Sequence, residues 1–250
     1  MRWSRLLLLS VLMGVSARAQ YCEGREVSGP YGIQFSGDTA ISKKRAPVAG
    51  MGRIVFAGDR TVNGYSTVEF DGLLLGNPVT GTYSLAHDCT LSLDLQDDSG
   101  AFQHFRGRVT DGGRLADLRH IDPGTGEQAL LVRSAATCDA RDLRAAYTLA
   151  VAGAHTPVDM PNAVTSVSAK GTFRRDYRGV LSVAWNPGTP QSRVVPAAAN
   201  VQSDCVVEFE FDSPAGNHWK LRGILVNHGA EILSLVTNPG EAITVRFTAR

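Results

Sequence analysis

The spacing of four cysteines divides this chain into two similar halves. Cys22 and Cys89 are 67 residues apart, Cys138 and Cys205 are also 67 apart, and the second pair lies 116 residues after the first. The same shift of 116 superimposes further identical residues without a gap: Tyr31 and Tyr147, Gly37 and Gly153, Asp88 and Asp204, Arg106 and Arg222, and Pro123-Gly124 and Pro239-Gly240. This period exceeds that of stacked solenoid repeats. The chain is therefore predicted to be a tandem duplication of one small domain.

The residues before the repeats have the pattern of an export signal. Arg2 and Arg5 precede an apolar run at 6–15, and Ala17-Arg18-Ala19 supplies the small residues that signal peptidase accepts. The run is too short to span a bilayer, which takes about 20 residues. We therefore expect a signal peptide at 1–19, repeats at 20–136 and 137–250, and a secreted or periplasmic protein. We expect no membrane span in the remaining chain.

The cysteines are expected to form disulfides after export. Four cysteines allow three pairings, but a self-contained repeat should carry its own bond. The prediction is therefore Cys22–Cys89 and Cys138–Cys205. Metal ligation is the weaker interpretation, because no Cys-X-X-Cys spacing is present. We expect no metal and no cofactor.

The charge balance narrows the class of partner. The full chain has 25 basic and 24 acidic side chains, and the expected signal peptide removes three arginines and no acid. The mature chain would carry a net charge of −2. Such a balance excludes a strongly basic protein that binds nucleic acid by neutralising phosphates, so no nucleic-acid partner is expected.

Short runs with alternating polarity follow one another in each repeat. Leu91, Leu93 and Leu95 alternate with polar residues, as Val207, Phe209 and Phe211 do in the second repeat. Turn-forming residues separate about eight such runs in the first repeat, at 30–37, 50–58, 64–75, 79–87, 89–96, 101–110, 114–122 and 127–134. This predicts an all-β protein of two tandem antiparallel up-and-down β-barrels of about eight strands each. A pair of β-sandwiches is the alternative.

One segment resembles a known group of proteins. The run Gly81-Thr82-Tyr83 through Asp88-Cys89-Thr90 resembles a "GTY…DCT" motif in exported bacterial tandem-repeat β proteins. The resemblance implies calycin-like barrels of the allene-oxide-cyclase type. The second repeat departs from the motif, because Ala199 and the residues after it stand where Tyr83 and its neighbours are. Equal function of the two repeats is therefore in doubt.

The hairpin around Asp111-Gly112-Gly113-Arg114 predicts which side chains face inward. A symmetric turn sets Phe105 opposite His120, and the equivalent turn sets Leu221 opposite Val236. Because that face is apolar in the second repeat, it is predicted to be the interior. The candidate ligand-binding residues are Gln103, Phe105, His120 and Asp122, at one mouth of the first barrel. The alternative interpretation of His120 is a partly hydrated rim histidine.

No catalytic signature stands out in the sequence. The Gly-X-Ser-X-Gly elbow, the His-Glu-X-X-His motif, the Walker loop and the dinucleotide fingerprint are missing. The leading hypothesis is a secreted or periplasmic, non-enzymatic protein that binds a small apolar ligand or a partner. A cyclase or isomerase is the first alternative, and it requires an open lumen in repeat 1 near Gln103, Phe105 and His120. A purely structural envelope protein is the second, and it would have two packed barrels and a large interface between them.

Overall fold

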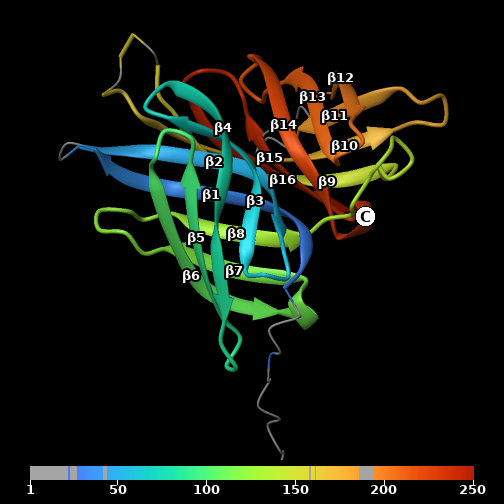
Figure 1. Ribbon diagram of the computed structural model, residues 1–250. Coiled ribbons are helices and arrows are strands. Elements are labelled where there is room, and N and C mark those ends of the chain that lie inside the picture. The colour runs from blue at the N-terminus through green and yellow to red at the C-terminus, as the bar shows by residue number, and fades with distance from the viewer. Residues whose placement is uncertain (1–21, 23–26, 42–43, 158, 161, 186–193) are drawn as a thin grey trace, which may run out of the picture.

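The computed structural model contains two closed β-barrels that lie side by side, barrel 1 in blue to green and barrel 2 in yellow to red (Figure 1). It describes residues 22, 27–41, 44–157, 159–160, 162–185 and 194–250, so the expected signal peptide lies outside the described residues. The strands of barrel 1 are β1 (Gly29–Ile41), β2 (Lys44–Phe56), β3 (Thr61–Phe70), β4 (Leu73–Leu85), β5 (Thr90–Asp97), β6 (Phe102–Thr110), β7 (Leu115–His120) and β8 (Gln128–Arg133). Those of barrel 2 are β9 (Ala146–His155), β10 (Thr165–Arg175), β11 (Leu181–Trp185), β12 (Val194–Val201), β13 (Val206–Asp212), β14 (His218–Val226), β15 (Glu231–Val236) and β16 (Glu241–Ala249).

Each strand pairs with the next, and the last strand of each barrel closes on the first. β8 pairs with β1, and β16 pairs with β9. This up-and-down closure confirms the predicted barrels over the sandwich alternative, and it leaves no open sheet edge. The predicted register is also confirmed, because Phe105 pairs with His120 and Leu221 pairs with Val236. Short 3-10 turns, η1 (Asp111–Gly113) and η2 (Asn227–Gly229), join those strands.

One predicted strand boundary was wrong. The run 64–75 was expected to be a single strand with a break at Asn77-Pro78, but the chain turns at Asp71-Gly72, where φ is 48° and 83°. An Asp-Gly pair is a strong hairpin turn, and the leucines after it hid the turn. Pro78 lies inside β4, where β5 starts pairing only at the next residue. It therefore occupies an edge position that tolerates the missing N–H.

Both predicted disulfides are present, one in each barrel. Cys22 is bonded to Cys89 with a Cα–Cα distance of 5.0 Å, and Cys138 to Cys205 with 4.8 Å. Cys89 and Cys205 both have a left-handed backbone, with φ of 67° and 68°. The repeats therefore share a local conformation as well as a bond. Two disulfides are consistent with an extracytoplasmic location.

Aromatic side chains fill the interior of both barrels. In barrel 1, Phe56 lies edge-on to Tyr31 and Tyr83, with ring centroids 5.1 and 4.8 Å apart. In barrel 2, the ring of Phe247 stacks on Phe209 at 4.7 Å and meets Phe173 edge-on at 5.9 Å. Such aromatic contacts contribute about 0.5–1.5 kcal/mol each beyond area burial. Where these rings lie, the lumen of each barrel is therefore filled by side chains.

A third apolar cluster joins the outer faces of the two barrels. Barrel 1 contributes Ala49, Met51 and Val132, and barrel 2 contributes Val206, Ile224, Val226, Leu233, Leu235 and Ala242. The approach is close, because a Cβ added at Gly32 of β1 would lie 2.6 Å from Val226 Cγ1. Polar contacts flank the cluster: Gln34 Nε2 donates to the carbonyl oxygen of Ser234 at 2.8 Å, and Ser134 Oγ donates to that of Leu225 at 2.7 Å. The interface therefore fixes the orientation of the two barrels.

A buried carboxyl from barrel 1 reaches barrel 2 at this interface. Glu69 is 1% exposed, and its Oε1 accepts a hydrogen bond from the backbone N–H of Gly240 at 3.2 Å. Burial raises the pKa of Glu69, the N–H groups of Gly240 and Gly72 partly offset this, and the charge of Glu241 raises it further. Burial likewise raises the pKa of Glu241. The contact between the barrels thus brings together two buried carboxyl groups whose charged forms are destabilised by desolvation.

We predict that Glu69→Gln stabilises the protein at alkaline pH. Because the pKa of Glu69 is higher in the folded state, the folded protein holds its proton more tightly, and stability falls as pH rises from the ordinary glutamate pKa through the raised one. Glutamine keeps the acceptor for Gly240 without the charge. Thermal unfolding followed by circular dichroism should show a larger gain in Tm at pH 8 than at pH 5.

The exposed Glu208→Gln is the matched control for this prediction, since it removes a carboxylate on the outer surface of barrel 2. It should leave the pH dependence of Tm unchanged. A Tm for Glu69→Gln at pH 8 equal to or below that of the unsubstituted protein would contradict the prediction.

Candidate functional site

The predicted site residues of repeat 1 lie near the start of β6 and the end of β7. His120 is the last residue of β7, and its ring stacks on that of Phe105 in β6 with centroids 4.8 Å apart. Asp122 follows in the turn before β8. Gln103 is half-buried and pairs with Leu95 of β5, two residues from Phe105 and so on the same face. The structure therefore brings His120 together with Phe105 and Asp122, and places Gln103 on the same face of β6 as Phe105.

His120 lies between two carboxylates. Its Nδ1 is 2.9 Å from Glu127 Oε2, and its Nε2 is 2.7 Å from Asp122 Oδ2. The side chains of His120 and Glu127 are only 7% and 5% exposed. Both ring nitrogens must donate to serve two carboxylates, which requires the imidazolium form. Burial lowers the pKa of His120, but the hydrogen bonds to Glu127 and Asp122 outweigh it, so the pKa is raised.

Asp122 also holds the neighbouring strand. Its Oδ1 is 2.7 Å from His104 Nδ1, and its Oδ2 accepts the backbone N–H of His104 at 3.0 Å. Burial raises the pKa of Asp122, but these hydrogen bonds and the one to His120 lower it further than burial raises it. In barrel 2 the equivalent Asn238 accepts the backbone N–H of Lys220 at 2.8 Å. The backbone contact is thus common to both repeats, whereas the histidines are specific to barrel 1.

The lumen beside this cluster is occupied by side chains. Phe105 is buried and its ring lies 6.2 Å from that of Phe35. The cyclase alternative requires open space at this point, so the packing argues against it. In the described part of the chain, no group of three or more His, Cys, Asp or Glu side chains is arranged to hold a metal ion. Ligand binding by Gln103, Phe105, His120 and Asp122 stays a prediction.

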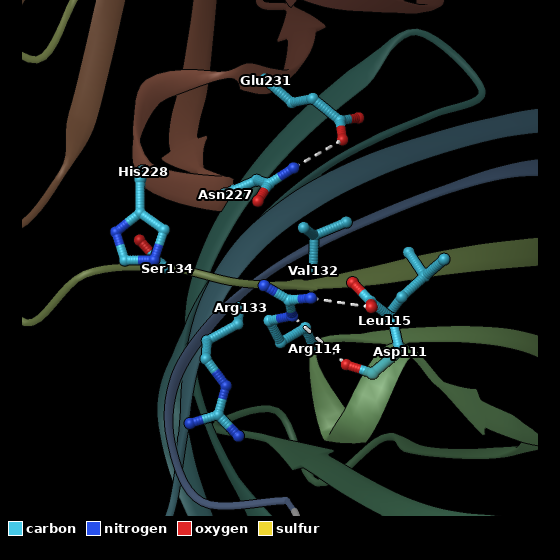
Figure 2. Close-up of a pocket in the computed structure, with 9 residues that line it drawn as sticks. All are labelled: Asp111, Arg114, Leu115, Val132, Arg133, Ser134, Asn227, His228 and Glu231. Atoms are coloured by element: carbon cyan, nitrogen blue, oxygen red, sulfur yellow. Dashed lines mark hydrogen bonds and ion pairs between the residues drawn. The ribbon is translucent and has the colours of Figure 1, made fainter.

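A small cavity of about 90 Å³ lies between the barrels, where η1 and η2 approach each other (Figure 2). Asp111 and Asn227, at equivalent positions of the two repeats, both line it. Arg114 Nη2 pairs with Asp111 at 2.8 Å, and Asn227 Nδ2 lies 3.4 Å from Glu231 Oε1. The guanidinium of Arg133 points away from these groups (Figure 2) and donates to Tyr31 Oη at 2.8 Å. This volume suits a few water molecules, which occupy about 30 Å³ each in the liquid.

A larger cavity of about 340 Å³ opens at the mouth of barrel 2. Inward-facing side chains of β10, β14 and β16 line it, namely Val167, Ala169, Trp219 and Glu241. His155, at the end of β9, pairs with both Thr165 and Glu241 across its neighbouring strands. Phe211 and Trp185 close the lumen beside Trp219, with Trp185 6.1 Å from the Trp219 ring. The cavity is therefore the open end of a filled barrel.

Glu241 is the charged group of this mouth. It is buried, and its Oε1 lies 3.2 Å from His155 Nδ1. Burial raises its pKa, while the charge of His155 and the proximity of the Trp219 indole and the His155 ring lower it by less. Trp219 is 3% exposed, and its Nε1 has no partner at hydrogen-bond geometry. The mouth thus contains a desolvated carboxyl beside an indole N–H that forms no hydrogen bond of full geometry.

Sequence reasoning missed this second mouth. The candidate residues were sought only in repeat 1, because Val236 and Trp219 of barrel 2 replace His120 and Gln103 of barrel 1, and the cyclase alternative expected a filled barrel 2. The sequence does contain a sign of this mouth at another pair of positions. His155 and Glu241 are paired in barrel 2, and the equivalent residues of barrel 1, Thr39 and Thr125, form a β-bridge. A comparison of the repeats at those two positions would have found it.

Comparisons with known proteins leave the family open. No protein-family model matches the chain, and no curated protein matches its sequence. The "GTY…DCT" resemblance and the calycin-like assignment therefore stay predictions. Among the described residues, no helix is long and apolar enough to cross a membrane.

Three solved structures share features of the fold at low similarity. Isotype 1 transferrin binding protein B from serogroup B Neisseria meningitidis has 10% identity and a TM-score of 0.37 over 90% of this chain and 77% of that one. A protein provisionally assigned as AttH from Nitrosomonas europaea has 7% and 0.26 over 97% and 99%. A provisionally assigned outer membrane protein from Bacteroides fragilis has 11% and 0.23 over 90% and 98%. At these scores, the function must be argued from the chain's own geometry.

We predict that His120 and Glu127 stabilise barrel 1 only as a pair. His120→Val, which introduces the residue of barrel 2, leaves the buried Glu127 carboxylate without its partner and should cost about 2–3 kcal/mol. The double variant His120→Val/Glu127→Ile copies Val236 and Ile243 and should lie within about 1 kcal/mol of the unsubstituted protein. Urea unfolding at pH 6 measures both free energies. A double variant no more stable than His120→Val would refute the coupling.

The same pair has a defined pH dependence. Because the pKa of His120 is raised in the folded state, its stabilising contribution is complete below the ordinary histidine pKa and is lost as pH rises through the raised one. The stability difference between the unsubstituted protein and the double variant should therefore shift in favour of the double variant as pH rises.

Proposed function

We propose that this chain is an extracytoplasmic, non-enzymatic protein that binds a small molecule with an apolar body at the mouth of barrel 2. The observation that carries the proposal is the cavity of about 340 Å³ at the end of a barrel that is otherwise filled. Small-molecule sites occupy about 300–1,000 Å³ and combine an apolar lining with few polar groups. The mouth has a volume in this range, and its lining combines apolar side chains such as Val167 and Ala169 with the hydroxyl groups of a few serines and Thr165 and the carboxyl group of Glu241.

The mouth of barrel 1 offers less to a ligand. His120 already uses both ring nitrogens on Asp122 and Glu127, and Phe105 covers the space beneath it. A ligand would have to replace these bonds. At barrel 2, by contrast, the indole N–H of Trp219 forms no hydrogen bond of full geometry, although Glu241 lies near it. A purely structural role accounts for the packed barrels and their interface, but it does not account for the cavity at the barrel 2 mouth.

We predict that the neutral lipophilic dye N-phenyl-1-naphthylamine binds once per chain at this mouth. Ala169→Phe should fill the cavity and weaken dye binding at least tenfold, while His120→Val/Glu127→Ile, at the other barrel, should leave it unchanged. Fluorescence titration measures the Kd, and circular dichroism verifies folding of each variant.

Three results bear against this assignment. Absence of dye binding to the unsubstituted protein, or equal binding to Ala169→Phe, would contradict a site at the mouth of barrel 2. Loss of binding in the barrel 1 double variant would instead favour the cluster predicted from the sequence, Gln103, Phe105, His120 and Asp122.

Partner binding is a second candidate function, favoured by the β3–β4 hairpin. Leu73, Leu74 and Leu75 are adjacent and exposed, with Leu73 61% accessible. Neighbouring exposed leucines are typical of contact surfaces. A photo-crosslinker at position 74 in the native host should label one discrete partner, and Leu73→Ser/Leu75→Ser should abolish that labelling while dye binding is retained. Diffuse labelling that both proteins share would exclude this candidate.

A further inference from the structure

The barrel 2 mouth has the chemistry to recognise charge. We propose that its ligand is a small organic cation, an ammonium group on a short hydrocarbon chain, held by Glu241 and Trp219. This inference rests on the proposed function and adds the class of ligand. The charge of the lining, the indole and the apolar wall each support it.

Among the described residues that line the cavity, Glu241 is the one carboxyl. Glu241 is buried there, and Glu69 from barrel 1 lies close enough to repel it. None of the described residues that line the cavity is a lysine or an arginine. His155 is the one cation-forming side chain of that lining, and it is 39% exposed. Burying a carboxylate costs desolvation free energy unless the charge is paired. His155 offsets this cost for Glu241 only in part, and a bound cation would offset the remainder.

Trp219 adds a second contact for an ammonium group. Its indole lines the cavity and is held in place by the edge-on ring of Trp185 at 6.1 Å. Tryptophan is the best cation–π partner, contributing about 2 kcal/mol or more when the cation is desolvated. The unsatisfied Nε1 can in addition donate to any oxygen that the ligand or a bound water presents. A rigid indole beside a buried carboxyl is thus a preorganised cation site.

Part of the remaining wall suits hydrocarbon, and the hydroxyl and amide side chains of Thr165, Ser166, Ser168, Ser213 and Asn217 form the rest. Val167 and Ala169 of β10 face inward, and Pro214 and Ala215 of the β13–β14 turn lie at the rim. A chain that extends from Glu241 along this wall would be removed from water at about 25 cal/mol per Å² of apolar surface. An anionic molecule of the same shape would gain this burial but meet the Glu241 carboxylate. The site should therefore separate ligands by charge rather than by shape.

Barrel 1 lacks this arrangement. Thr39 and Thr125 occupy the positions of His155 and Glu241, and Gln103 occupies that of Trp219. The duplication thus provides a natural reference for the proposal, because each essential group has a neutral or non-aromatic counterpart in the same chain. It also supplies a substitution that the fold already accepts at position 241.

The test compares three ligands of equal length: n-hexylamine, 1-hexanol and hexanoate. Isothermal titration calorimetry on the unsubstituted protein and on each variant provides the Kd. At pH 8 we expect the amine to bind at least tenfold more tightly than the alcohol, and hexanoate to bind more weakly than the alcohol. Glu241→Gln and Glu241→Thr should abolish this preference without weakening hexanol binding, and Glu208→Gln should change neither.

The outcomes test the preference for a cation and the existence of the binding site separately. Equal affinities for the amine and the alcohol, or a cation preference that survives both Glu241 substitutions, would overturn the cation assignment and leave the proposed binding site intact. Failure of all three ligands and of N-phenyl-1-naphthylamine to bind would overturn the proposed function itself. The threonine variant keeps the test valid if glutamine at this position impairs folding.

Discussion

The contact between the outer faces of the two barrels is the constraint on which the rest of the structure depends. Ala49 and Met51 of β2 pack against Ile224, Val226 and Leu233 of barrel 2. An outer barrel surface normally faces water, yet here the second half of β14 and most of β15 are buried on both faces. Apolar burial is non-directional and scales with area, so it holds the barrels together, while the close approach at Gly32 fixes their orientation. Glu69 reaches Gly240 only because of this orientation.

Much of the fold follows from features that are local in sequence. The equal spacing of the cysteines predicted both disulfides, and alternation in runs such as Leu91, Leu93 and Leu95 predicted the inward faces. The symmetric turn at Asp111-Gly112-Gly113 predicted the pairing of Phe105 with His120. These inferences succeed because strand pairing has a period of two, and a turn of known length fixes the register. Even the partly buried position of His120 followed from that register.

The remaining features depend on contacts between distant segments. Ala49 and Met51 are read from sequence as ordinary residues of a strand, and nothing local indicates that a second barrel covers them. Glu127 lies seven residues from His120, but their pairing depends on how the turn closes. The mouth of barrel 2 combines β9, β10, β14 and β16, so its cavity exists only after the barrel closes. Glu241 alone, in the sequence, is an unremarkable acid after a Pro-Gly turn.

The interface between the barrels uses a different surface of each repeat, which bears on self-assembly. A head-to-tail contact of this kind can in principle propagate from one chain to the next and produce a fibre. The duplicated surfaces prevent this. Where barrel 1 presents Ala49 and Met51, the strand register of barrel 2 places exposed Ser168 and Lys170. Where barrel 2 presents Ile224, Leu233 and Leu235, the shift of 116 residues gives barrel 1 Arg108, Asp117 and Arg119. At these positions each repeat is apolar where the other covers it and polar at the equivalent surface, so a second copy of the chain meets no exposed apolar counterpart for this contact there.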